Sequence, residues 1–322
     1  PMPKPHLARW VGDADAFLDV TWRRQPAVHR PPPRLPPPLT LADLDTLLET
    51  GLLHSPYVEM ARADDFVPQE AYCSARTVNR TAHPGYADAR KVREQLDRGN
   101  TLLLRCVDQW HPATARLVAG LAAELGRRIE AFVFVTPPGS QGLPLHRDDA
   151  DVLTLQISGS KHWYVHTGPD DDRWGPGPLT PVAKVPSAPD ADPELLLSQV
   201  LGPGEVLYIP RGFAHRATGD AGLSVHLSLT IREPGAADLH RALQYHLAAG
   251  VRTAASRPVD EAGLLAAAKG LLDHYRARLE AASPDALVEA ARRAQVAQAL
   301  PRISPGLTAL AEELATREST DG

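Results

Sequence analysis

The stretch of sequence that decides the fold is TPPGSQGLPLHRDDADVLTLQISGSKHW, which spans residues 136–163. It contains two segments rich in aliphatic and β-branched residues, DVLTLQI (151–157) and KHWYV (161–165). We predict that they are strands, joined into a hairpin by the turn at Gly159-Ser160. Comparable segments nearby are FVFVT (132–136), EVLYIP (205–210) and LSVHLSLTI (223–231). Many short strands bounded by Gly, Pro and Asp are typical of a sandwich or barrel, and a jelly roll is one such fold.

The regions on either side of these strands have a different character. Residues 1–128 are mixed, with a buried strand at 101–107, and we expect them to complete the core domain of residues 129–232. Residues 233–300 are predicted to form a helical domain, and residues 301–322 a short last helix. The helices that we expect are 14–22, 40–48, Tyr86–Asp97, Ala113–Leu125, Leu239–Ala249, Glu261–Ala281, Ala286–Ala299 and Leu307–Glu318. The fold class is therefore α+β, with a double-stranded β-helix (jelly-roll) core, an N-terminal mixed region and a C-terminal helical domain.

Composition excludes several classes of protein. The chain has 322 residues, of which 43% are hydrophobic and 23% are charged, as in ordinary globular proteins. No apolar run is long enough to cross a bilayer, and the start of the chain has no signal-peptide pattern. Two cysteines, Cys73 and Cys106, cannot build a disulfide framework or a cysteine metal site. We therefore expect a cytoplasmic protein with no membrane association. A net charge of −5 gives no support for direct nucleic-acid binding, and the excess of arginine over lysine suggests a bacterial source.

His146 and Asp148, together with the distant His215, are candidate metal ligands. In an extended segment, residues i and i+2 project to the same side, so His146 and Asp148 can bind one ion together. His215 ends the segment GEVLYIPRGFAH (204–215), where a neighbouring strand begins. Two imidazoles and one carboxylate form the facial triad of non-haem Fe(II) oxygenases. The alternative for His215 is an ordinary histidine at the end of a strand.

Lys161 is the candidate for binding a dicarboxylate cosubstrate. It shares one strand face with Trp163 and Val165, and a lysine on such a face is costly if the face is buried, unless an anion lies beside it. One carboxylate end of 2-oxoglutarate is a suitable anion, and Thr136 could add a hydroxyl group to the same site. The alternative is a surface lysine whose ammonium reaches water.

Four motifs in this order resemble those of the JmjC-type ribosomal oxygenases, which are cupin-like hydroxylases of histidine or arginine side chains in ribosomal proteins. The motifs are the TPPGSQG loop, the H-x-D-D sequence, the L-Q-x-x-G-x-K-x-W block and GEVLYIPRGFAH, and the resemblance covers residues 105–232. It implies a cupin/JmjC jelly roll in which His146, Asp148 and His215 bind Fe(II) and Lys161 binds the C5 carboxylate of 2-oxoglutarate. It also implies O2 as cosubstrate and a homodimer formed through helices after the barrel. The winged-helix module of the family is expected to be truncated here.

The chain departs from this family on the strand before TPP. Human-type members have Asn and Tyr where this chain has Phe132 and Phe134, so the floor of the pocket is expected to be more apolar. Binding of 2-oxoglutarate would then depend more on Lys161, on Thr136 and on a hydroxyl of the last strand. Either Ser228 or Thr230 can supply that hydroxyl.

The function expected from these residues is hydroxylation of an amino-acid side chain in a protein or peptide, with a His or Arg of a ribosomal protein as the first candidate. Arg147, Gln141 and the acidic, Pro/Gly-rich segment 167–195 are candidates for the substrate side, and the alternative for each is a solvated loop. His226 has the residue type of a metal ligand but lies near His215 in sequence.

Three other functions are compatible with parts of this pattern. A histone-type demethylase would share the iron site, but no cage for methylated lysine is visible in the sequence. A tailoring hydroxylase would act on a ribosomally made natural-product peptide or on a small molecule. A non-oxidative metal-binding cupin would instead show an H-x-H…E…H arrangement, whereas Asp148 replaces the second histidine here and Lys161 supplies a cation.

Overall fold

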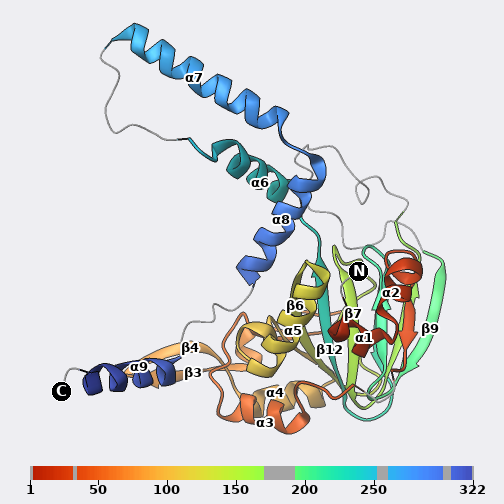
Figure 1. The fold of residues 1–322 in the computed structure, drawn as a ribbon. Coiled ribbons are helices and arrows are strands. Elements are labelled where there is room, and N and C mark those ends of the chain that lie inside the picture. Colours follow the sequence, from red (N-terminus) through yellow and green to blue (C-terminus); the bar gives the residue numbers. More distant parts are fainter. Residues whose placement is uncertain (1–2, 32–34, 170–192, 252–259, 300–305, 321–322) are drawn as a thin grey trace.

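The fold is that of a computed structural model, which describes residues 3–31, 35–169, 193–251, 260–299 and 306–320 (Figure 1). The strands are β1 (Ala27–His29), β2 (Val58–Ala61), β3 (Cys73–Val78), β4 (Thr81–Ala87), β5 (Thr101–Leu104), β6 (Arg128–Thr136), β7 (Asp151–Ser158), β8 (Lys161–His166), β9 (Leu195–Leu201), β10 (Val206–Ile209), β11 (His215–Gly219) and β12 (Ser224–Arg232). The helices are α1 (Pro5–Val11), α2 (Ala14–Ala16), α3 (Leu41–Glu49), α4 (Ala89–Asp97), α5 (Pro112–Leu125), α6 (Ala236–Ala248), α7 (Glu261–Glu280), α8 (Pro284–Ala299) and α9 (Leu307–Thr320). Most of the expected segment 167–195 lies outside the described residues.

Two antiparallel sheets face each other across a shared core. The larger sheet has the strand order β1-β10-β7-β12-β6-β5-β2, and the smaller has the order β11-β8-β9. Side chains from both sheets form one apolar cluster: Val152, Trp163, Val165, Leu201, Leu207 and Ile209. The predicted jelly-roll core with mixed helices is therefore confirmed. The N-terminal region adds β1, β2 and β5 to the larger sheet.

The prediction that Gly159-Ser160 closes a hairpin is wrong. Both flanking strands exist, but β7 pairs with β10 and β12 in the larger sheet, whereas β8 pairs with β9 and β11 in the smaller. The turn carries the chain from one sheet to the other and bonds to residues 220–221 instead. Gly159 has φ +56°, and a Cβ atom there would lie 2.5 Å from the backbone oxygen of Leu223, so a glycine is needed at this crossing.

A second correction concerns the helix expected at Tyr86–Asp97. Its first residues belong to strand β4, and α4 begins only at Ala89. Asp88 caps this helix, because its side chain accepts a hydrogen bond from the backbone N–H of Lys91 at 3.1 Å. Asp88, the residue directly after β4, is therefore the N-cap at which helix α4 starts.

Strand β12 is buried on both faces and separates two environments. Val225, Leu227, Leu229 and Ile231 join the apolar core that α1 and α5 cover on the outer side of the larger sheet. The alternate residues His226, Ser228 and Thr230 line a cavity between the two sheets. Pairing with β6 on one side and β7 on the other fixes this alternation. Strand β12 therefore presents hydroxyl and imidazole groups to the cavity.

Helices α6, α7 and α8 extend from the β-sandwich as an arm (Figure 1). Helix α8 contacts both α6 and β6, which anchors the base of the arm. Helix α7 buries none of its side chains. Within the described ranges, no helix combines the length and the apolar character needed to cross a bilayer.

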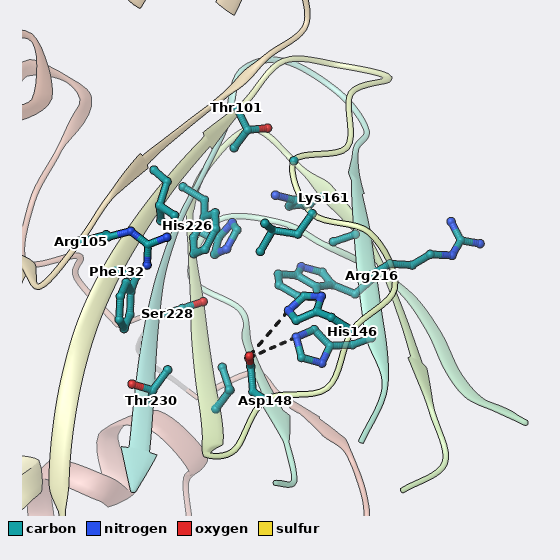
Figure 2. A pocket seen from close by; sticks show the side chains of 18 of the residues that line it. Thr101, Arg105, Phe132, His146, Asp148, Lys161, Arg216, His226, Ser228 and Thr230 are labelled. Atoms are coloured by element: carbon teal, nitrogen blue, oxygen red, sulfur yellow. Dashed lines mark ion pairs between the residues drawn. The ribbon is translucent and has the colours of Figure 1, made fainter. Parts of the chain in front are cut away.

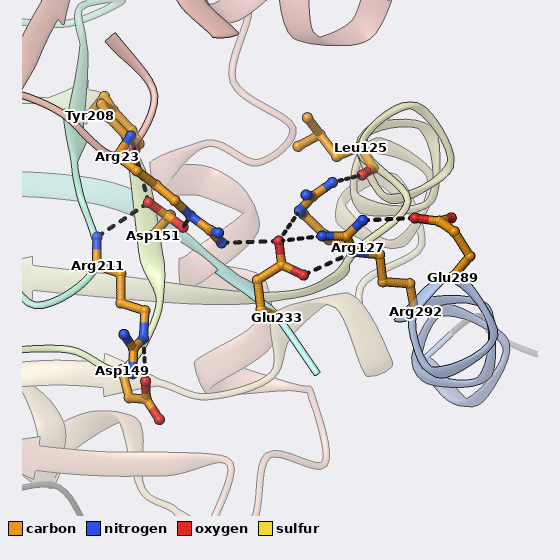
Figure 3. Close-up of polar contacts among 10 residues, drawn as sticks. All are labelled: Arg23, Leu125, Arg127, Asp149, Asp151, Tyr208, Arg211, Glu233, Glu289 and Arg292. Carbon is orange, nitrogen blue, oxygen red and sulfur yellow. Dashed lines mark hydrogen bonds and ion pairs between the residues drawn. The ribbon is translucent and has the colours of Figure 1, made fainter. Parts of the chain in front are cut away.

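A network of charged side chains holds the base of the arm to the sandwich (Figure 3). Glu233, which directly follows β12, accepts hydrogen bonds from Arg127 at 2.7 Å and Arg292 at 3.0 Å and forms an ion pair with Arg23 at 3.1 Å. Arg23 also bonds to the fully buried Asp151 at 3.1 Å. Burial alone would raise the pKa of Glu233, but these arginines outweigh it and hold that pKa below the ordinary value of 4.5.

We expect Glu233→Gln to destabilise the fold by about 1–3 kcal/mol at pH 7, because three guanidinium groups then lack their shared carboxylate. Since the pKa of Glu233 is lowered by folding, its contribution is complete above pH 4.5 and is lost as the pH falls through the folded-state pKa. Thermal unfolding of both proteins across this range measures the difference. Glu289→Gln is the control, because Glu289 bonds Arg292 from an exposed position. Equal midpoints for wild type and Glu233→Gln would contradict the role of the network.

Candidate active site

Three side chains converge at one end of the cavity between the sheets (Figure 2). The Asp148 carboxylate lies 3.8 Å from Nε2 of His146 and 3.5 Å from Nε2 of His215. One ligand atom from each residue lies within 4.8 Å of the other two, which is close enough to hold one ion. Two imidazole nitrogens and one carboxylate oxygen are the donor set of a facial triad, so the residues fit Fe(II).

Both imidazoles are oriented by backbone carbonyl groups. Nδ1 of His146 lies 2.8 Å from the oxygen of Pro144, and Nδ1 of His215 lies 3.0 Å from that of Phe213. Each Nδ1 therefore carries the proton and donates it, which leaves the Nε2 lone pair directed at the common point near Asp148. Burial lowers the pKa of His215, which keeps this imidazole neutral and able to bind a metal.

Backbone hydrogen bonds bring the two distant motifs together. The amide of His146 donates to the oxygen of His215 at 3.1 Å, and the amide of His215 donates to the oxygen of His146 at 2.8 Å. The Gly212 amide also donates to the oxygen of Asp148 at 3.0 Å. The loop after β6 is thus paired with the first residue of β11. This pairing places a ligand from residue 215 beside two ligands from residues 146 and 148.

Lys161 lies at the other end of the cavity and is almost completely buried. Its ammonium donates to Oγ1 of Thr136 at 2.9 Å and lies 5.8 Å from the ring centroids of both Phe134 and Trp163. Among the described residues, no carboxylate forms an ion pair with it. Burial lowers the pKa of Lys161 to about 7. An unpaired ammonium in an apolar pocket is a binding site for an anion.

The cavity that joins these two ends has a volume of about 230 Å³. Ser228 and Thr230 both line it from β12, with Ser228 the nearer to His226 (Figure 2). The Ser228 hydroxyl is 3.0 Å from Oγ1 of Thr154, and the Thr230 hydroxyl donates to the backbone oxygen of Glu130 at 3.5 Å. Both hydroxyls therefore face the cavity wall, and the choice between them as a cosubstrate ligand remains a prediction.

Comparison with known proteins gives this arrangement a family context. Residues 109–239 match the family model described as the JmjC domain. This part of the chain is therefore similar to a JmjC domain. Rat ribosomal oxygenase 1 is 34% identical over 149 residues, which cover 46% of this chain and 24% of the relative. Mouse ribosomal oxygenase 2 is 27% identical over 224 residues, which cover 67% of this chain and 44% of the relative. The chain thus spans less than half the length of these relatives.

A solved structure supports the fold independently. The X-ray structure of E. coli ycfD aligns with a TM-score of 0.51 at 18% sequence identity, over 83% of this chain and 70% of that one. At this identity the likeness concerns the fold alone. The resemblance to JmjC-type ribosomal oxygenases that the motifs indicated is confirmed by the family model and the curated relatives together.

The two residues proposed for the substrate side are not among the residues that line the cavity. Arg147 is buried and donates to the backbone oxygens of Thr167 at 2.8 Å and Gly212 at 2.6 Å. Gln141 donates to the oxygen of Leu143 at 2.9 Å. Both side chains therefore bond to backbone oxygens of the loops near the metal ligands. Their role toward a substrate stays a prediction.

Sequence reasoning missed four polar residues that line the cavity: Thr101, Arg105, Arg216 and Arg232. Thr101 and Arg105 belong to the mixed N-terminal region, and they reach the site because β5 pairs with β6. Thr101 donates to Oγ1 of Thr136 at 3.2 Å and so extends the hydroxyl cluster beside Lys161. The alternation of TLLLR places residues 101, 103 and 105 on one face, but the neighbouring strand could not be read from it.

We expect His146→Ala to weaken binding of Mn(II) by at least about 100-fold, because one of three ligands is lost. The fold should be retained, since the side chain of His146 is partly exposed and makes one hydrogen bond. An electron paramagnetic resonance titration measures the free Mn(II). His162→Ala is the matched control, because His162 bonds Ser198 on the opposite face of β8. Equal Mn(II) affinity in both variants would remove His146 from the metal site.

Proposed function

We propose that this chain is an Fe(II)- and 2-oxoglutarate-dependent dioxygenase that hydroxylates an amino-acid side chain of a protein or peptide. The observation that carries the proposal is a single cavity with a facial triad at one end and a buried, unpaired Lys161 at the other. The triad suits a redox metal, and the lysine suits the far carboxylate of a dicarboxylate. The buried Lys161 distinguishes this proposal from a non-oxidative cupin, for which the metal site alone would be expected.

The residues of the chain would divide the work in the following way. His146, Asp148 and His215 would hold Fe(II), which with bound 2-oxoglutarate and O2 supplies the oxidation of an unactivated C–H bond and yields succinate and CO2. Lys161 and Thr136 would hold the C5 carboxylate. Burial between two sheets excludes water from this end of the cavity and strengthens every charge interaction there. The protein thus contributes position and a dry site.

The substrate that we favour is a histidine or arginine side chain of a ribosomal protein in the bacterial cytoplasm. The choice of a ribosomal protein rests on the curated relatives, whose names describe them as ribosomal oxygenases. The choice of histidine or arginine rests on the resemblance of the four sequence motifs alone. A tailoring hydroxylase acting on a ribosomally made peptide or a small molecule is the alternative. Reaction with isolated ribosomal proteins, followed by intact-mass measurement, separates the two, because only the first gives a gain of one oxygen atom.

The reaction class is tested by anaerobic reconstitution with Fe(II) and 2-oxoglutarate. We expect a visible charge-transfer band that requires both components and bleaches on addition of O2, with succinate released. Absence of the band, together with tight binding of another divalent metal, would move the chain to the non-oxidative cupins.

Affinity for 2-oxoglutarate should fall about tenfold for each pH unit above 7, because the pKa of Lys161 is about 7 and only the protonated amine pairs with the carboxylate. Isothermal titration calorimetry of the Mn(II)-loaded protein, in buffers of different ionisation enthalpy, should show proton uptake at alkaline pH. Lys161→Met should bind weakly at every pH and take up no proton. An identical pH profile for that variant would show that another group is responsible.

We also propose that the chain forms a homodimer through the helical arm. Helix α7 exposes five leucines while burying no side chain: Leu264, Leu265, Leu271, Leu272 and Leu279. They recur at helical spacing, so they form one apolar stripe on the helix. Exposed apolar stripes of this kind are typical of surfaces that a partner covers.

The double variant Leu265→Glu/Leu272→Glu should be monomeric, because charges would then occupy the centre of the stripe. Sedimentation velocity over a range of concentrations measures the state of the wild type and the variant. Lys269→Glu on the same helix is the control for an added charge. A wild-type monomer at every concentration would remove the dimer.

A further inference from the structure

His226 is a buried polar side chain that lacks a partner. It lies on the inward face of β12, is 2% exposed and lines the same cavity as Lys161 and the metal ligands. Its Nδ1 atom is fully buried and has no hydrogen-bond partner among the described residues. Because Nδ1 is covered by protein atoms, a ligand in the cavity would reach the other ring nitrogen, Nε2, which makes no hydrogen bond within the described residues.

The surroundings of His226 place it beside the ammonium of Lys161. The imidazole stacks on Phe134 with ring centroids 4.8 Å apart and meets Trp163 edge-on at 5.2 Å. The Lys161 ammonium lies 5.8 Å from each of those same two ring centroids. Figure 2 shows His226 and Lys161 together at this end of the pocket, away from the dashed contacts of Asp148. The imidazole is therefore a neighbour of the proposed carboxylate site rather than of the metal site.

The charge state of His226 suits a hydrogen-bond donor. Burial, and then the nearby charge of Lys161, lower the pKa of His226 well below its ordinary value, so the ring is neutral. A neutral imidazole carries one N–H donor and one acceptor nitrogen. The neighbouring rings of Phe132 and Phe134 offer no hydrogen-bond donor, and Lys161 uses one of its three donors on Thr136. The carboxylate of a ligand would accept from both Lys161 and His226.

We propose that His226 donates a hydrogen bond to the C5 carboxylate of 2-oxoglutarate and completes a dicarboxylate anchor with Lys161 and Thr136. The inference rests on the proposed function, since it assigns one further residue to the cosubstrate of that reaction. Stacking on Phe134 requires only an aromatic ring at position 226. A hydrogen bond to the carboxylate explains why this ring is a histidine. Phe132 and Phe134 on β6 supply no hydrogen-bond donor. His226 on the neighbouring strand β12 supplies one at the same place, because it pairs directly with Phe134.

The test compares two ligands that share the metal-binding 2-oxo acid group. 2-Oxoglutarate has the distal carboxylate, whereas 2-oxobutyrate ends in a methyl group. Both are titrated calorimetrically into the Mn(II)-loaded full chain. In His226→Phe, which keeps the ring and removes the donor, we expect 2-oxoglutarate to bind about 10- to 100-fold more weakly. The affinity for 2-oxobutyrate should change less than about twofold. His226→Gln, which restores a neutral N–H donor, should recover most of the loss.

Three controls make the result decisive. His162→Phe makes the same substitution on the far face of β8, and it should change neither affinity. Thermal unfolding reports whether each variant is folded, and His226→Met replaces His226→Phe if the latter is not. Unchanged 2-oxoglutarate affinity in the donor-free variant, or equal weakening of both ligands, would overturn the inference. If the wild type itself shows no metal-dependent binding of 2-oxoglutarate, it is the proposed function that fails.

Discussion

The pairing of β12 with both β6 and β7 is the constraint on which the rest of the structure depends. It holds alternate residues of one strand in two environments, with aliphatic side chains under α1 and α5 and polar ones toward the cavity. A slip of one residue would exchange these faces, placing His226 and Ser228 in the apolar layer and their aliphatic neighbours in the site. The apolar burial therefore fixes the register, and the register in turn fixes the positions of the polar groups.

Burial of the Lys161 ammonium in the cavity lowers the stability of the folded protein. Keeping its ammonium charged in the cavity, where the pKa falls from 10.5 to about 7, is unfavourable by roughly 5 kcal/mol relative to water. A methionine would fill the space without that penalty. The free protein is thus less stable than it could be at the place where a dicarboxylate would supply the missing charge. Natural proteins commonly give up stability in this way at sites that bind ligands.

The sequence predicted the strands of the core, the jelly roll and the local pair His146 and Asp148, because each depends on nearby residues. It failed where distant pairing decides the outcome. The turn at Gly159 looks like a hairpin locally, yet it joins two sheets, since its partner is the loop at residues 220–221. Thr101 and Arg105 could not be placed in the site without knowing that β5 lies beside β6. His226 was noticed by residue type, but its partners, Phe134 and Trp163, are set by the packing of two sheets.

The same strand also links the cavity to the helical arm. At the end of β12, Arg232 lines the cavity and bonds Glu130 at 2.8 Å, and the next residue, Glu233, gathers the arginines at the base of the arm. Consecutive side chains of one backbone segment therefore serve the cavity and the arm. Because α8 also contacts β6, the base of the arm is attached to two strands that form the cavity wall. The attachment of the arm and the wall of the cavity therefore depend on the same two strands.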